Sequence, residues 1–166
     1  GNFIKRTIWY VVNEIFFRNR FFIWSKPKVL ILKLFGAKVG SGVIIKPGVN
    51  IKYPWKLKIG DFCWIGEGVW IDNLDDVEIL NNVCLSQGSM LLCGNHDFKK
   101  STFDLITKKI TIKEGCWVGA KAIVCPGVTL HSSSILTVNS VASTDLKASG
   151  IYKGNPARLI RERKIC

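Results

Sequence analysis

The sequence predicts an all-β fold, a three-sided solenoid of short strands, from three features. An aliphatic side chain recurs every six residues, a second column of mostly small side chains follows it by four residues, and Pro47-Gly48 and Pro126-Gly127 supply turns. A period of six fits neither the 3.6 of a helix nor the 2 of a simple strand, but it fits short strands joined by tight corners. Three such hexads make one triangular coil.

The aliphatic column is divided into three runs of equal spacing. They are Val39, Ile45, Ile51 and Leu57; Ile59, Ile65, Ile71, Val77, Val83 and Ser89; and Ile112, Val118, Val124, Leu130, Leu136 and Ala142. Residues eighteen apart should stack in successive coils, so we expect Ile59 on Val77, Ile65 on Val83, Ile112 on Leu130 and Val118 on Leu136. Four residues depart from the pattern: Asp75, Leu80, Asn81 and Gln87.

Length and composition restrict the class of protein. With 166 residues the chain has room for one domain, and 48% hydrophobic residues exclude disorder. The net charge of +12 favours an anionic partner, whether nucleic acid, anionic lipid or a phosphorylated small molecule. The basic residues are scattered and form no recognition motif, so we expect no nucleic-acid partner.

The six cysteines form no CxxC pair, and we expect reduced thiols, with Cys63, Cys93 and Cys116 filling the core. The most hydrophobic stretch, residues 8–24, is shorter than the roughly 20 apolar residues of a membrane span. It is also interrupted by polar side chains, namely Asn13, Glu14, Arg18 and Arg20.

Five stretches within residues 34–160 carry more specific signals: LFGAKVGSGVIIKPGVNIKYPWKLKIGD, WIGEGVWIDNL, VCLSQGSMLLCGNHD, CWVGAKAIVCPGVTL and GNPARLI. Together they resemble the hexapeptide-repeat acyltransferases, and most closely the colanic-acid-type O-acetyltransferases, relatives of the maltose and galactoside enzymes. The resemblance implies a left-handed parallel β-helix, an exception to the usual right-handed crossover. It also implies a homotrimer with each active site in the cleft between neighbouring subunits.

Three segments lie outside the repeat. Residues 1–36 are expected to be helical, over 3–24 and again over 28–35, and the β-helix over 37–150 is interrupted by a protruding loop at 97–110. Residues 151–166 are predicted to form a C-terminal helix, because Asn155 is a good N-cap and Pro156 suits the first helical position.

The predicted catalytic residue is His96, in a Gly-Asn-His-Asp segment where the repeat is lost. A sugar hydroxyl is a weak nucleophile and needs a base near neutrality, which imidazole with a pKa of about 6.5 provides. The family uses a histidine at this position. His131, inside a coil, is expected to be structural. The resemblance also places an active-site asparagine at Asn73, which could instead be a corner-turn residue, and Asp97 could orient the site.

Acetyl-CoA, the expected cosubstrate, requires a slot for pantetheine and cations for its phosphates. By resemblance the slot is lined by Trp117, Ala120 and Val138, although Trp117 could equally be an exposed coil residue or a subunit contact. Because the thioester is already activated, direct transfer in a ternary complex needs no protein nucleophile and no metal. Two histidines are also too few for the three-histidine zinc site of related β-helix carbonic anhydrases.

Three residues are expected near the CoA phosphates. Ser143 falls where the family has a Thr-Lys-Asp segment, but the chain has no lysine there. Arg158 and Arg161 match basic residues at the nucleotide end and would share one face of the terminal helix. The alternative is that both arginines lie on the solvent-exposed face of this helix and bind no ligand.

The sequence therefore predicts an acetyl-CoA-dependent O-acetyltransferase that modifies a sugar hydroxyl during surface polysaccharide synthesis. We expect it in the cytoplasm or at the inner face of the membrane, with peripheral membrane contact through residues 3–24. The alternative is a non-enzymatic basic β-helix scaffold, with the same segment lying on anionic lipid.

Overall fold

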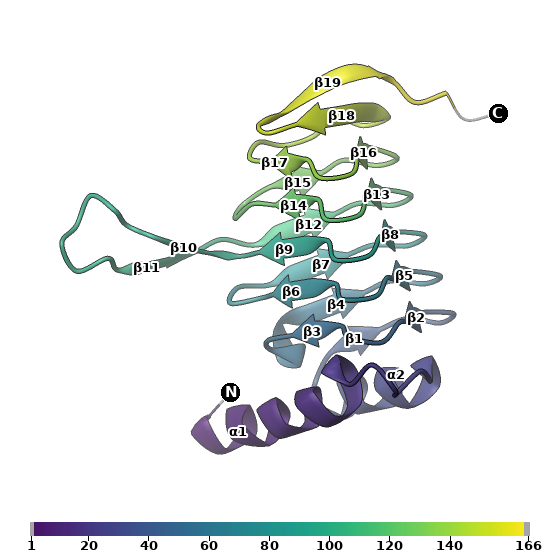
Figure 1. Cartoon of the computed structure of the whole chain (residues 1–166), viewed down its shortest axis with the longest axis vertical. Coiled ribbons are helices and arrows are strands. Elements are labelled where there is room, and N and C mark those ends of the chain that lie inside the picture. The colour runs from purple at the N-terminus through teal and green to yellow at the C-terminus, as the bar shows by residue number, and fades with distance from the viewer. Residues whose placement is uncertain (1, 165–166) are drawn as a thin grey trace.

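Most strands of the solenoid have two or three residues, and in most of them a buried side chain lies next to an exposed or half-buried one. Strand geometry requires this alternation, since successive side chains point to opposite faces, and β1, Lys38–Val39, shows it. In the structure, a computed structural model that describes residues 2–164, the strands stack into three parallel sheets around one aliphatic core (Figure 1). The predicted all-β solenoid of hexapeptide repeats is confirmed.

The three sheets are the faces of the solenoid, named A, B and C in the order in which each coil crosses them. Face A contains β1, β4 (Leu57–Ile59), β7 (Val77–Ile79), β12 (Ile110–Ile112) and β15 (Thr129–Leu130). Face B contains β2 (Ile44–Ile45), β5 (Trp64–Ile65), β8 (Cys84–Leu85), β13 (Trp117–Val118), β16 (Ile135–Leu136), β18 (Gly150–Gly154) and β19 (Ala157–Glu162). Face C contains β3 (Asn50–Ile51), β6 (Trp70–Asp72), β9 (Met90–Leu92), β14 (Ile123–Val124) and β17 (Val141–Ala142).

The register corrects the predicted stacking in the first half of the solenoid. Ile59 pairs with Ile79 and Ile65 with Leu85, and not with Val77 and Val83, because these coils repeat after twenty residues. After the interruption the predicted spacing of eighteen is right: Ile112 pairs with Leu130 and Val118 with Leu136.

The two extra residues of the longer coils lie at the corner between faces C and A, which lengthens β7 by one more inward side chain, Val77. Val83 and Ser89 are still buried, but as members of the second column, four residues after Ile79 and Leu85. Asn81 and Gln87 therefore lie at corners, where polar residues are tolerated.

Two helices close the N-terminal end of the solenoid. Helix α1 spans Phe3–Val12 and continues as a π-helical turn over Asn13–Arg18, and α2 spans Ser25–Leu34. The second helix begins three residues earlier than predicted, with Pro27 inside its first turn, where a missing N–H leaves no hydrogen bond unmade. Among the described residues no helix is long and apolar enough to cross a bilayer.

These helices supply polar partners to the first coil, whose lower edge has no further strand to bind. Trp9 Nε1 donates to the Ile51 carbonyl at 2.8 Å, and the buried Asn13 side chain bonds Asn50 and the Ile51 N–H. From α2, the buried Lys28 ammonium donates to the Ile45 and Lys46 carbonyls at 3.3 and 3.1 Å. Open sheet edges leave such groups unsatisfied, so the helices act as a cap.

The predicted C-terminal helix is wrong. Residues 150–162 form an antiparallel hairpin of β18 and β19, with Gly154 in the turn at a φ of +102°. Without β19, β18 would be the open upper edge of face B. Satisfying its backbone groups outweighs the local capping signal at Asn155 and Pro156. Residues 165 and 166, including Cys166, lie outside the described part of the chain.

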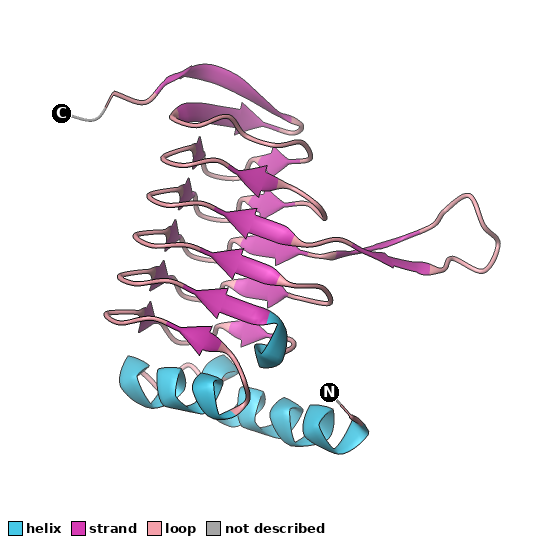
Figure 2. Ribbon diagram, turned by 180° about the vertical axis from the view of Figure 1, so that it is seen from behind, coloured by secondary structure: helices cyan, strands magenta, loops and turns pink. Residues whose placement is uncertain are grey.

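The predicted loop at 97–110 does protrude, but it is part of a longer hairpin. Strands β10, Gly94–His96, and β11, Leu105–Thr107, pair antiparallel and project from the corner between faces C and A (Figure 2). The stacking of the coils continues past this hairpin, since Ile112 of β12 pairs directly with Ile79 of β7.

The three cysteines assigned to the core are buried and free, as expected. Burial raises the pKa of each of these thiols, and that of Cys93 to about 11. A thiol with a raised pKa forms little thiolate near neutrality, so these three are poor nucleophiles.

The buried Lys28 makes stability depend on pH. Burial, with a contribution from Lys46, lowers its pKa from 10.5 to about 8, so between pH 8 and 10.5 the unfolded chain binds more protons. The contribution of Lys28 to the free energy of unfolding should therefore rise with pH across this window, by up to about 1.4 kcal/mol per pH unit. It is measured as the difference between the wild type and Lys28→Met, because the buried thiols contribute an opposite slope at the alkaline end. Lys28→Met should lose this rise in urea melts, whereas the exposed Lys26→Met should keep it. Parallel pH profiles for the wild type and Lys28→Met would contradict the assignment.

Candidate active site

His96 ends strand β10, where the chain has left the solenoid, so its ring is exposed rather than packed in a coil. The imidazole Nδ1 lies 2.7 Å from the carbonyl oxygen of Phe103, across the hairpin. A carbonyl only accepts hydrogen bonds, so in the neutral ring the proton must be on Nδ1. Nε2 is then unprotonated, which is the form that can accept a proton from a substrate.

Among the described residues, the hydrogen bonds of Asp97 go to the hairpin and not to this ring. Its backbone N–H donates to the Asp104 carbonyl, and its carboxylate accepts from the backbone N–H of Lys99, so Asp97 shapes the start of the hairpin loop. The orienting group is the Phe103 carbonyl. Sequence reasoning missed it because a backbone oxygen carries no residue signal and is brought in only by the hairpin.

Asn73 lies in the core, with a side chain that is 0% exposed. Its Oδ1 accepts from the Tyr53 N–H at 2.9 Å, and its Nδ2 donates to the Tyr53 carbonyl. The amide therefore joins two coils at the corner between faces C and A, and its burial keeps it away from a substrate bound at the surface. The structure supports the corner-turn role in place of the catalytic one.

The residues expected to line a pantetheine slot lie close together. Trp117 is exposed on face B, and its Nε1 donates to Ser86 Oγ at 2.8 Å. Ala120 and Val138 lie on the adjoining corner between faces B and C, one above the other, since the Asn139 N–H bonds the Ala120 carbonyl. Val138 is 63% exposed, so this corner presents an apolar surface to solvent.

Arg158 and Arg161 lie on strand β19 and not on a helix, yet they still share a face. Three residues apart on a regular strand they would point to opposite sides, but a bulge in the β18–β19 pairing changes the register. Arg158 pairs with Lys153 and Arg161 with Ile151, two residues apart on β18 and thus on the same side of the sheet. That side is the outward side of face B, and β19 is the third strand above β13, which carries Trp117.

Ser143 is separated from these residues. It follows β17 at the corner between faces C and A, where it is exposed, and the neighbouring Asp145 accepts a hydrogen bond from the Thr129 N–H. Within one chain the structure does not bring Ser143 to the Trp117 surface.

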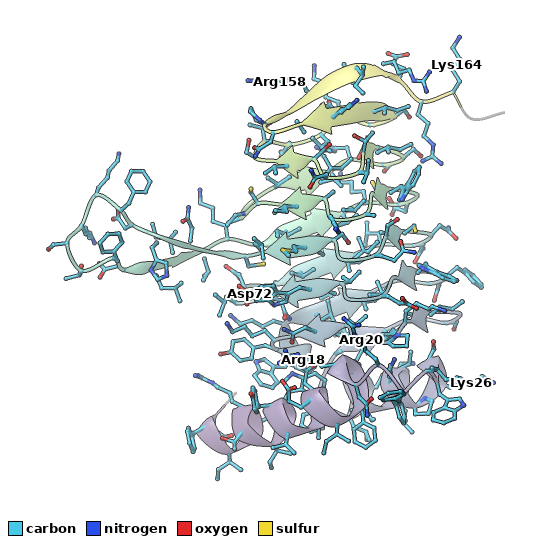
Figure 3. All side chains as sticks on the ribbon, in the orientation of Figure 1. Arg18, Arg20, Lys26, Asp72, Arg158 and Lys164 are labelled. Carbon is cyan, nitrogen blue, oxygen red and sulfur yellow. The ribbon has the colours of Figure 1, made fainter. Side chains whose placement is uncertain are left out.

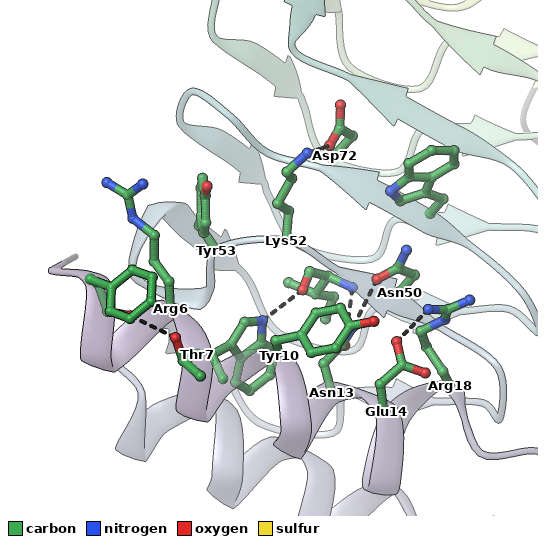
Figure 4. Close-up of a pocket in the computed structure, with 14 residues that line it drawn as sticks. Arg6, Thr7, Tyr10, Asn13, Glu14, Arg18, Asn50, Lys52, Tyr53 and Asp72 are labelled. Carbon is green, nitrogen blue, oxygen red and sulfur yellow. Dashed lines mark hydrogen bonds and ion pairs between the residues drawn. The ribbon is translucent and has the colours of Figure 1, made fainter.

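Sequence reasoning also missed a groove of about 570 Å³ between α1 and face C (Figure 4). Aromatic and charged side chains line it, among them Arg6, Tyr10, Lys52, Tyr53, Trp70 and Asp72. Such a mixture suits a polar ring compound, since aromatic faces stack on rings and charged groups bind hydroxyls or anions.

The groove lies on the same edge as the hairpin. Lys52 contacts Asp72 at 3.2 Å, and Asp72 pairs with Leu92, two residues before β10 begins. The upper wall of the groove is thus directly below the point from which the hairpin carries His96 outward (Figure 3).

The outward sides of the three faces differ in character. Face A carries charged and polar side chains: Lys38, Lys58, Glu78, Thr111 and Thr129. Face B carries a mainly apolar column: Ile44, Trp64, Cys84, Trp117, Ile135 and Ile151. Face C is also mainly apolar: Asn50, Trp70, Met90, Ile123 and Val141. Apolar columns of this length are typical of surfaces that take part in protein–protein or ligand contacts.

His96 and Trp117 lie on opposite sides of one chain. The hairpin projects from one edge of the solenoid, whereas β13 and the rest of face B lie on the other side (Figure 1). Within a single chain the structure therefore does not bring His96 next to Trp117. Within residues 2–164 no three His, Cys, Asp or Glu side chains are grouped so that they could hold a metal ion.

No family model matches the chain. Its sequence is 38% identical over 169 residues to the "Putative colanic acid biosynthesis acetyltransferase WcaF" of Escherichia coli (strain K12), covering 98% of this chain and 90% of WcaF. It is 28% identical to the galactoside O-acetyltransferase of the same strain, over 83% of this chain and 69% of that enzyme.

Solved structures share the fold. The hexapeptide-repeat containing acetyltransferase VCA0836 from Vibrio cholerae matches with a TM-score of 0.88 and 19% identity, over 98% of this chain and 92% of that one. Galactoside acetyltransferase in complex with coenzyme A matches with a TM-score of 0.85 and 23% identity, over 97% and 82%.

The contact between His96 and Phe103 predicts the tautomer of the resting protein. Long-range ¹H–¹⁵N correlation spectra at a pH where the ring is neutral should show His96 protonated on Nδ1. Replacing residues 98–102 by a shorter turn should abolish this preference, because Phe103 would no longer be held across from the ring. A ring protonated on Nε2 in the intact hairpin would contradict the geometry.

Proposed function

The chain belongs to the hexapeptide-repeat acetyltransferases, in the family of WcaF, and from this premise we propose how its residues transfer acetyl from acetyl-CoA to a sugar hydroxyl. The process it serves is surface polysaccharide synthesis, as the name of WcaF indicates. The observation that carries the proposal is the exposed His96 ring, held by the Phe103 carbonyl with Nε2 free.

In the transfer His96 acts as a general base. Nε2 takes the proton of the acceptor hydroxyl as its oxygen attacks the thioester carbonyl, and the carbon–sulfur bond then breaks. The imidazolium returns the proton to the CoA sulfur, so the ring is neutral again at the end of the turnover. The Phe103 carbonyl stabilises the imidazolium, because it accepts a hydrogen bond from Nδ1 throughout.

We propose the groove between α1 and face C as the acceptor site. Trp70 offers a flat face for a sugar ring, whereas the Tyr53 ring is already stacked on Trp55. The Lys52–Asp72 pair offers donors and acceptors for hydroxyl groups. Its upper wall leads to the hairpin that carries His96. The acceptor and the base are thus supplied by the same edge of the same chain.

The donor is bound by the outward side of face B and the adjoining corner. Trp117, Ala120 and Val138 would contact pantetheine, while Arg158 and Arg161 would contact the phosphates of the nucleotide end. Ser143 could reach the same CoA only from a neighbouring chain, since it lies on another corner.

We infer a homotrimer in which each site is shared. In each of three equivalent contacts, face B of one subunit meets face C of the next, and the charged face A stays in water. Contacts between two different faces are what a closed threefold ring requires. The hairpin of one subunit then lies against face B of the next, bringing His96 to Trp117 of its neighbour. The cleft is incomplete in a monomer.

The compartment that supplies acetyl-CoA is the cytoplasm, and we place the enzyme there, with the peripheral membrane contact predicted for residues 3–24 as part of the proposal. The alternative of a non-enzymatic scaffold is less well supported, because a scaffold has no use for an oriented imidazole. Thioester cleavage that depends on added sugar separates the two.

Replacing the base should remove turnover and leave donor binding intact. His96→Ala is expected to lower kcat by roughly 10²–10⁴, because a general base acts in the transition state. The Kd for CoA, measured by calorimetry, should change less than about twofold. His131→Ala, which removes the other imidazole, should be silent. Activity of His96→Ala within a few-fold of the wild type would rule out this role.

The arginines of β19 should act on the donor alone. Arg158→Ala combined with Arg161→Ala is expected to raise the KM for acetyl-CoA roughly tenfold or more while lowering kcat less, since charge-assisted hydrogen bonds to phosphate are lost. The defect should shrink for acetyl-pantetheine, which lacks the nucleotide, and Lys38→Ala on face A serves as the charge control. Equal defects with both donors would show that these arginines do not contact phosphate.

A further inference from the structure

The end of the molecule formed by the helices exposes an unusual amount of apolar surface. We define the helical base as residues 3–34, which lie across the N-terminal end of the solenoid (Figure 1). Its exposed large apolar side chains are Phe3, Ile4, Ile8, Tyr10, Val11, Ile15, Phe21, Ile23, Trp24, Leu30 and Leu34. None of these is needed to close the solenoid, since other residues of the base do that.

Helix α1 has two apolar sides. Trp9, and Phe17 in the π-helical turn that follows α1, are buried. Ile4, Ile8 and Val11, at the spacing i, i+4, i+7, form a second stripe that is 51–65% exposed. At 100° per residue this stripe points well away from Trp9, so it faces outward from the solenoid. A helix that only caps a solenoid requires one such side.

The stripe continues into the rest of the base. Phe21 is 90% exposed and Trp24 59% in the segment between the helices, and α2 adds Leu30 and Leu34 at the spacing i, i+4. Aromatic side chains beside aliphatic ones, on a surface at one end of a molecule, are typical of segments that lie in a membrane interface.

The charge of the base is one-sided. Residues 3–34 contain seven basic residues and one acidic residue. The basic residues are Lys5, Arg6, Arg18, Arg20, Lys26, Lys28 and Lys33, of which Lys28 is buried, and the acidic one is Glu14. Lys26 and Lys33 are exposed on α2 beside Leu30 and Leu34, so cations and apolar side chains share this surface.

We propose that the helical base binds the surface of a bilayer that contains anionic lipid. A second copy of the base would bring cations against cations, whereas anionic headgroups neutralise them while the apolar stripe enters the interface. The surface belongs to a single chain. In the proposed trimer, with its axis along the solenoid, three bases lie in one plane and bind together.

Bound in this way, the solenoid stands away from the membrane. The groove opens just above α1, at the level of the headgroups, and Arg6 and Arg18 of the helical base line it. The acceptor site would then be within reach of a glycan that is itself attached to a lipid, a refinement that rests on the proposed function. The membrane binding itself does not depend on the acetyl transfer proposed for His96.

The test is flotation of the full chain with vesicles of phosphatidylcholine containing 30% phosphatidylglycerol, and with pure phosphatidylcholine. The wild type should float with the anionic vesicles only, and less at high salt. Lys26→Gln with Lys33→Gln should weaken binding roughly tenfold or more. Ile8→Ser with Phe21→Ser should weaken it to a similar extent. Circular dichroism should show that both variants remain folded.

Matched controls remove the same groups elsewhere. Lys147→Gln with Lys153→Gln takes two exposed cations from the opposite end of the solenoid, and Phe62→Ser removes a side chain that is 68% exposed at a coil corner. Both should float like the wild type. Acetyl transfer to a soluble sugar should be unchanged in the Lys26 and Lys33 variant, so loss of binding and loss of the proposed function are distinguishable.

Three results would overturn the proposal. One is a wild type that stays at the bottom of the gradient with both kinds of vesicle. Another is equal flotation of the base variants and their controls. The third is self-association of the chain in sedimentation that the base variants abolish, since the occupant of this surface would then be a second copy.

Discussion

The structure depends on one constraint. The inward side chains of each coil must stack on those of the coil below, while its backbone forms hydrogen bonds with the coils above and below it. Three columns of aliphatic residues meet this requirement, and strands of two or three residues are long enough because all but the edge strands have partners on both sides. Only the corners can change length. The hairpin of residues 94–107 enters at a corner, and Leu91 still pairs with Val124 behind it. A catalytic group can thus be added without disturbing the core.

The same constraint creates two open ends and three outward faces, and the functional features occupy them. The lower end is capped by Trp9, Asn13 and Lys28, which leaves the far side of the helices free to face a membrane. The upper end is closed by β19, whose bulge sets Arg158 and Arg161 on one side. Two faces are mainly apolar. His96 and the proposed donor surface around Trp117 lie on different sides of the chain. In the trimer that we propose, a neighbouring subunit supplies the missing wall of each active site.

The sequence predicts the repeat and most of the candidate residues, but not their full arrangement. The twenty-residue coils are hidden because Val77 and Val83, two residues out of register, are also aliphatic and buried, so both frames fit the pattern. The C-terminal helix was predicted from local signals at Asn155, and the pairing of a distant strand edge overrides them. The Phe103 carbonyl and the groove above α1 arise from segments brought together only by folding, and neither has a local signal.

The central claim is that each active site is shared between two subunits, His96 from one and Trp117 from the next. It is tested most directly by mixing inactive His96→Ala chains with impaired Trp117→Ala chains, exchanging subunits, and measuring acetyl transfer. Each parent trimer has a defect in every cleft, whereas a mixed trimer contains one cleft with neither substitution. We expect activity to appear on mixing, up to about one third of the wild type per mixed trimer. No gain of activity in mixed trimers confirmed by native mass spectrometry would place both residues on the same chain's side of the cleft.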